Sequence, residues 1–148
     1  MNLLISACLM GIKCRYDGGT QRFDRLDELM ERCVLVPVCP EVLGGLSTPR
    51  DPSEIVDGQV LSCKGRDVTE AFVKGAEEAA RIARMCGCSC ALLKERSPSC
   101  GCGQVYDGTF SGAKREGNGL CAGALLKQGV RVFGESRVNE LLDEIKEL

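Results

Sequence analysis

The feature that most constrains the fold of this sequence is a pattern that occurs three times: a short apolar run leading into a turn that carries a cysteine. The three runs and their cysteines are residues 3–7 with Cys8, residues 34–38 with Cys39, and residues 90–94 with Cys100. Runs that are apolar at consecutive positions are typical of strands covered on both faces, as in parallel sheets. Because parallel strands end at the same sheet edge, where open α/β sheets bind their ligands, we expect the three thiols to converge there.

The segments between these runs have helical or turn patterns. We expect helices at residues 24–32, 69–86, 119–128 and 136–148, hairpins at 55–62 and 105–110, a loop at 42–52 and a further strand at 130–133. Asp24 and Ser136 are suited to cap the first and last of these helices. This order predicts one α/β domain over residues 1–148, with a mainly parallel, Rossmann-like sheet of about four or more strands, helices on both faces and small hairpins.

The overall composition limits the classes of partner. A formal net charge of -2 and an aromatic content of 4% argue against a protein that binds nucleic acid through phosphates and stacked bases. The N-terminal apolar run is interrupted by Lys13 and Arg15 and is far shorter than a membrane span of about 20 residues. We therefore expect a cytoplasmic protein that acts on a small molecule, with no membrane or nucleic-acid partner.

The cysteine content indicates metal or redox chemistry. The chain has 11 cysteines and no histidine, so its metal ligands would be mainly thiolates. Three converging thiolates suit an iron–sulfur cluster that leaves one iron open to bind substrate. Two alternatives remain open: a non-catalytic zinc or iron–sulfur module that acts as a sensor or sulfur carrier, and a thiol oxidoreductase that uses Cys88 and Cys90.

The other cysteines give weaker signals. Cys86, Cys88 and Cys90 are spaced more closely than zinc knuckles usually are, and Cys90 is expected to point into the sheet. Cys14 and Cys102 lie near the expected ligands and could be auxiliary ligands. A structural role is expected for the remaining three, which are Cys33, Cys63 and Cys121.

Several polar residues flank the expected cluster site. Glu41 follows Cys39 by two positions, where a desolvated carboxylate could transfer protons. Ser97 and Ser99 surround Pro98 beside Cys100, and their hydroxyls could hydrogen-bond to a ligand or cap the turn. Asp17 and residues 94–96 are expected at the same mouth, with Asp17 and Ser99 as substrate-binding candidates.

Seven segments of the sequence together resemble the thiouracil desulfidase family, long known as domain of unknown function 523. They are residues 6–11 (SACLMG), 15–19 (RYDGG), 39–46 (CPEVLGGL), 49–50 (PR), 67–69 (DVT), 94–101 (KERSPSCG) and 106–110 (YDGTF). The resemblance implies a 4Fe-4S cluster held by Cys8, Cys39 and Cys100, with Glu41 as acid/base and Ser97 as an assisting hydroxyl. It also implies non-redox removal of sulfur from a thiolated nucleobase such as 2-thiouracil, whose sulfur binds the open iron, to give uracil and sulfide.

Overall fold

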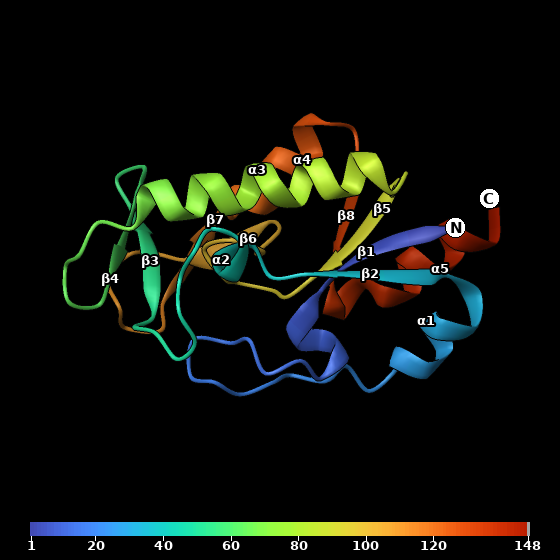
Figure 1. Cartoon of the computed structure of the whole chain (residues 1–148), viewed down its shortest axis with the longest axis horizontal. Coiled ribbons are helices and arrows are strands. Elements are labelled where there is room, and N and C mark those ends of the chain that lie inside the picture. The colour runs from blue at the N-terminus through green and yellow to red at the C-terminus, as the bar shows by residue number, and fades with distance from the viewer. Residues whose placement is uncertain (148) are drawn as a thin grey trace.

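A parallel sheet of four strands, in the order β2-β1-β5-β8, lies at the centre of the computed structural model, which describes residues 1–147 (Figure 1). The strands are β1 (Asn2–Ser6), β2 (Val34–Val38), β5 (Cys90–Leu93) and β8 (Arg131–Gly134). Leu4 of β1 pairs with Val36 on one side and Ala91 on the other. The expected parallel α/β sheet is therefore confirmed, with the first strand of the chain in an interior position.

Helices cover both faces of this sheet (Figure 1). The helices α3 (Thr69–Met85) and α4 (Leu120–Lys127) lie on one face, and α1 (Leu26–Arg32) and α5 (Val138–Glu147) lie on the other. Alternate residues of β1 serve the two cores, since Leu4 packs with the α3 and α4 side whereas Leu3 and Ile5 pack with the α1 and α5 side. Within residues 1–147, no helix is both long and apolar enough to cross a membrane.

The first of the two expected hairpins is confirmed, and the second has different strands. The strands β3 (Ser53–Val56) and β4 (Gln59–Ser62) pair around Asp57 and Gly58. In contrast, β6 (Gln104–Tyr106) pairs with β7 (Lys114–Glu116), so residues 107–110 belong to the connection. The amides of Gly108 and Phe110 donate to the Glu54 carboxylate instead of to a partner strand. This side-chain acceptor explains why a longer connection follows Tyr106 in place of the tight turn that Asp107 and Gly108 predict.

A short helix, α2 (Pro40–Leu43), begins where the sequence predicts only an irregular segment. Proline suits the first position of a helix because its missing N–H has no helical partner there. Two glycines bring α2 into backbone contact with α3. A β-carbon on Gly75 would lie 1.8 Å from the Pro40 carbonyl oxygen, and one on Gly44 would lie 1.9 Å from that of Ala71. Since no larger residue fits at either position, these glycines fix α2 against α3.

The predicted caps of the first and last helices are wrong. Arg25, and not Asp24, occupies the N-cap position of α1, and its side chain makes no cap hydrogen bond. Asp24 lies one residue before the position from which it could cap the helix. A short 3-10 turn, η2 (Glu135–Arg137), precedes α5. Ser136 lies within this turn, and its N–H donates to the Glu95 carboxylate. The predicted end of the last helix at Leu148 lies outside the described residues.

Candidate active site

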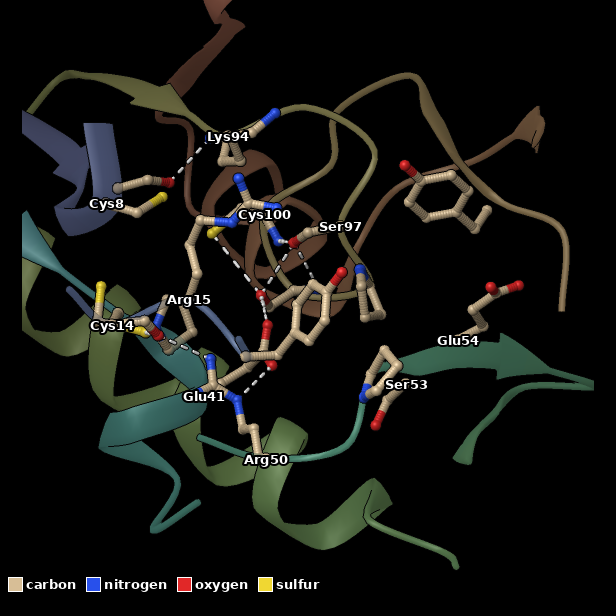
Figure 2. A pocket seen from close by; sticks show the side chains of 18 of the residues that line it. Cys8, Cys14, Arg15, Glu41, Arg50, Ser53, Glu54, Lys94, Ser97 and Cys100 are labelled. Carbon is tan, nitrogen blue, oxygen red and sulfur yellow. Dashed lines mark hydrogen bonds and ion pairs between the residues drawn. The ribbon is translucent and has the colours of Figure 1, made fainter. Parts of the chain in front are cut away.

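The three strand-end cysteines line one cavity of about 450 Å³ at the C-terminal edge of the sheet (Figure 2). Cys8 lies in η1 (Ala7–Met10), the 3-10 turn that follows β1 directly. Cys39 lies between the end of β2 and the start of α2. Cys100 is carried by the longer connection after β5, which turns back to the same edge. The parallel sheet thus brings together thiols that are far apart in the sequence.

The three candidate ligands in this cavity are all cysteine thiols. Among the described residues, no group of three or more Cys, Asp or Glu side chains is arranged to hold a single ion. A multi-iron cluster binds each cysteine to a different iron. An all-sulfur donor set is therefore compatible with a cluster.

Burial and hydrogen bonding give the three thiols different proton affinities. Burial raises the pKa of Cys8 to about 11, although the nearby Lys94 and Arg15 cations act in the opposite direction. Burial also raises the pKa of Cys100 well above its usual value. A hydrogen bond with the Cys14 thiol lowers the pKa of Cys39 to about 6. Binding iron requires thiolates, so metal binding has to remove protons from Cys8 and Cys100.

Glu41 lies in the same cavity and is held from two sides. Its Oε1 atom accepts from Arg50 Nε at 3.0 Å, and its Oε2 atom accepts from the Ser99 hydroxyl at 3.0 Å. Arg50 is itself anchored, since its Nη2 atom donates to the Cys14 carbonyl at 2.9 Å. The Arg50 side chain is only 8% exposed and that of Glu41 16%. This carboxylate is therefore oriented by two donors and shielded from bulk water.

Ser97 and Ser99 also line the cavity. The Ser97 Oγ atom accepts from the Cys100 N–H at 2.7 Å and from the Ser99 N–H at 3.2 Å. It also lies 3.1 Å from the Ser99 Oγ atom. These contacts connect the backbone of one candidate ligand, Cys100, to Glu41 through two hydroxyl groups (Figure 2).

The turn that carries these serines is held by the start of α4. The N–H groups of Cys121 and Ala122 both donate to the Ser99 carbonyl, and that of Leu120 donates to the Pro98 carbonyl. These first N–H groups of a helix have no partner within it, so the turn satisfies them. Gly119 permits this close approach, because a β-carbon there would lie 2.5 Å from the Ser99 carbonyl oxygen.

The remainder of the cavity has mixed character. Its lining includes the cations Arg15 and Lys94, the aromatic residues Tyr16 and Phe110, and the carboxylate of Glu54. Lys94 is paired with Glu135 at 2.8 Å. Figure 2 shows Glu54 at a distance from the group formed by Glu41, Arg50 and Ser97. The cavity thus extends well beyond the three thiols.

Not every residue singled out in the sequence reaches the cavity. Asp17 is absent from its lining and accepts the Gly19 N–H within its own turn. Among the cysteines outside the ligand set, Cys14 and Cys63 line the cavity. The lining does not include Cys33, Cys86, Cys88, Cys90, Cys102 or Cys121. The thiol-oxidoreductase alternative based on Cys88 and Cys90 therefore has no connection to this site.

Two residues of the site were not identified from the sequence. Arg50 was noted only within the Pro-Arg segment, and Glu54 was not noted at all. The signal for Arg50 in the sequence is its place in a short segment bounded by Pro49 and Pro52. Glu54 gives no such signal, since its position within β3 makes it look like a solvated strand residue.

Comparisons with known proteins cover nearly the whole chain. The profile of a family described as 2-thiouracil desulfurase matches residues 3–137. A solved structure of the 4Fe-4S-dependent thiouracil desulfidase TudS is 40% identical, with a TM-score of 0.94 and coverage of 99% of both chains. The uncharacterized protein YbbK of Bacillus subtilis (strain 168) is 41% identical over 150 residues, covering 95% of this chain and 99% of that protein. The matched regions include the cavity described above.

Proposed function

The chain belongs to the 2-thiouracil desulfurase family, and from this premise we propose that it hydrolyses the C=S group of a thiolated nucleobase such as 2-thiouracil. The enzyme is 4Fe-4S-dependent, like the TudS protein that it resembles. Water supplies the oxygen that replaces sulfur, so thiouracil and water give uracil and hydrogen sulfide. The reaction needs no net electron transfer.

The observation that carries this proposal is the convergence of Cys8, Cys39 and Cys100 on one cavity beside Glu41. We assign these three thiols as the cluster ligands, since they line one cavity and their all-sulfur donor set suits a multi-iron cluster. When bound, a cluster with three protein ligands would leave one iron able to polarise a C=S bond as a Lewis acid.

The chain's own polar groups then have distinct roles. Glu41 accepts a proton from the attacking water, since its carboxylate lies in the cavity and is held in place by Arg50 and Ser99. The hydroxyl of Ser97 donates to the substrate where negative charge develops. The cations of Arg15 and Lys94, which lie near Cys8, favour the anionic sulfur that the reaction releases.

We also propose that the enzyme works in the cytoplasm on a small molecule. All eleven cysteines are free thiols in the structure. Reducing compartments keep thiols in this state.

Anaerobic reconstitution followed by iron and sulfide analysis tests the proposal. We expect about four irons and four sulfides per chain, together with conversion of 2-thiouracil to uracil. Cys8→Ser, Cys39→Ser and Cys100→Ser should each lose the cluster and the activity. Cys102→Ser is the matched control, because this thiol is near Cys100 in sequence but outside the cavity. A wild-type protein that binds no iron, or that holds the cluster without desulfurating thiouracil, would contradict the proposal.

A further inference from the structure

The hydroxyl of Ser99 lies between Glu41 and Ser97, the two side chains to which the proposed function assigns catalytic roles. It is 3.1 Å from the Ser97 Oγ atom and 3.0 Å from Glu41 Oε2. Ser99 is only 2% exposed. A residue so deeply buried, with its hydroxyl already engaged on both sides, is better placed to hold its neighbours than to bind substrate directly.

The donor and the acceptor can be assigned for each hydrogen bond that joins Ser97, Ser99 and Glu41. Ser97 Oγ accepts two N–H groups, from Ser99 and Cys100. A hydroxyl oxygen has two lone pairs and one hydrogen, so the remaining interaction of Ser97 with Ser99 is as a donor. Ser99 therefore accepts from Ser97 and has its own hydrogen to donate. Its nearer acceptor is Glu41 Oε2 at 3.0 Å, and the Cys100 Sγ atom lies farther away at 3.7 Å. Ser97 thus donates a hydrogen bond to Ser99, and Ser99 donates one to Glu41.

The same arrangement fixes the orientation of the carboxylate. Arg50 holds Oε1 and Ser99 holds Oε2, so the carboxylate is tied at both oxygen atoms. The Ser99 backbone is tied in turn to the start of α4 through its carbonyl. Ser99 thus connects Glu41, which lies on α2, to the framework that carries Ser97 and Cys100.

We propose that Ser99 is a positioning residue that sets Glu41 and Ser97 relative to each other, and this inference rests on the function proposed above. Ser99 orients the carboxylate toward the attacking water and holds the Ser97 hydroxyl in a fixed direction until the substrate competes for its hydrogen. It touches neither the substrate nor the reacting atoms.

Steady-state kinetics of Ser99→Ala in the cluster-loaded enzyme test this role. We expect kcat to fall about 10- to 100-fold, since small displacements of reacting groups have effects of this size. KM should stay within about threefold of the wild-type value, because no substrate contact is lost. Iron and sulfide content should not change. Ser62→Ala is the matched control, since Ser62 is also buried and accepts two backbone N–H groups but lies outside the cavity lining.

A double-mutant cycle separates this role from a purely structural one. If Ser99 acts only through Glu41 and Ser97, adding Ser99→Ala to a Glu41→Gln, Ser97→Ala variant should change kcat by less than about twofold. The pair Glu41→Gln and Ser97→Ala should also be strongly non-additive. This second cycle leaves Ser99 unchanged, so it remains informative if Ser99→Ala fails to fold. Additive effects in these cycles would overturn the proposal.

A crystal structure of Ser99→Ala gives a readout independent of activity. We expect the Glu41 carboxylate to rotate away from its present position and the Ser97 side chain to adopt another rotamer. Unchanged positions of both, or a wild-type kcat in the cluster-loaded variant, would overturn the role of Ser99 while leaving the proposed function intact. Failure of the wild-type enzyme to desulfurate thiouracil would instead count against the proposed function itself.

Discussion

Two loops contribute residues to the cavity lining, and they are held in different ways. The inner loop, residues 97–101, accepts main-chain hydrogen bonds from the first turn of α4. The outer loop, residues 11–20, is held in part by Arg50, whose backbone N–H donates to the Tyr16 carbonyl and whose guanidinium donates to that of Cys14. The inner loop is therefore held to α4 by backbone groups that substitutions rarely remove, whereas part of the attachment of the outer loop comes from the side chain of Arg50.

The two loops also differ in burial, and this suggests a division of labour. Ser99 and Cys100 of the inner loop are 2% and 5% exposed, whereas Tyr16 of the outer loop is 40% exposed. Groups that take part in proton transfer need a fixed geometry. The mouth that admits a substrate benefits from side chains that can move. Glu41 is hydrogen-bonded to Arg50 on the outer side and Ser99 on the inner side, so loss of either hydrogen bond reaches the carboxylate.

The largest effect should come from the residue that the two loops share. We expect Glu41→Gln to lower kcat about 10²- to 10⁴-fold, the usual contribution of a general base. The amide keeps a similar shape, so iron and sulfide content should stay at the wild-type level. Single-turnover assays with cluster-loaded protein would measure this effect. A Glu41→Gln enzyme with wild-type kcat would show that another group accepts the proton.

A smaller effect is expected when the outer loop loses its anchor. Arg50→Ala should destabilise the protein by about 3–5 kcal/mol, because it leaves the partner of a buried ion pair uncompensated. It should also lower kcat about tenfold through Glu41. Urea unfolding and kinetics would measure both. Arg22→Ala is the control, since Arg22 pairs with Asp27 in an exposed position and should cost less than about 1 kcal/mol. Equal effects of the two substitutions would contradict the anchoring role of Arg50.

The smallest of the three expected effects comes from substituting single glycines. Gly119 lies at the start of α4, beside the inner loop, and Gly18 lies in the outer loop. Gly119→Ala places a β-carbon 2.5 Å from the Ser99 backbone, which should cost about 1–3 kcal/mol and lower kcat a few-fold. Gly18→Ala meets nothing within 4 Å but has a positive φ of 78°, which costs about 1–2 kcal/mol. Its kcat should be unchanged. If Gly18→Ala reduced kcat as much as Gly119→Ala, the contrast between the loops would not hold.

Much of the architecture could be predicted from the sequence because it depends on local patterns and one topological rule. The bounds of β2 agree with the apolar run at residues 34–38. Convergence of Cys8, Cys39 and Cys100 follows once the strands are parallel. The second hairpin was predicted wrongly, because the amides of Gly108 and Phe110 bond to Glu54, which is more than fifty residues away. A local pattern does not contain such a contact.

The candidate site was predictable to a similar degree. Glu41, Ser97 and Ser99 could be chosen because they are close in sequence to the cysteines. The role of Ser99 as a bridge requires the distance to Glu41, which is 58 positions away in the chain. Arg50 was missed as a site residue for the same reason, since its partners Glu41 and Cys14 are brought to it only by the packing of α2 and the outer loop.

The two glycines at the contact between α2 and α3 affect which substitutions could alter the substrate range of this enzyme. Glu41 keeps its place because Gly44 and Gly75 allow two backbones to touch, and neither glycine lies in the cavity lining. Residues at the open end, such as Tyr16 and Phe110, can therefore be replaced without shifting the carboxylate. Engineering of substrate range should begin at those aromatic positions and leave the glycine pair untouched, because mutagenesis libraries that vary it would consist mostly of inactive proteins.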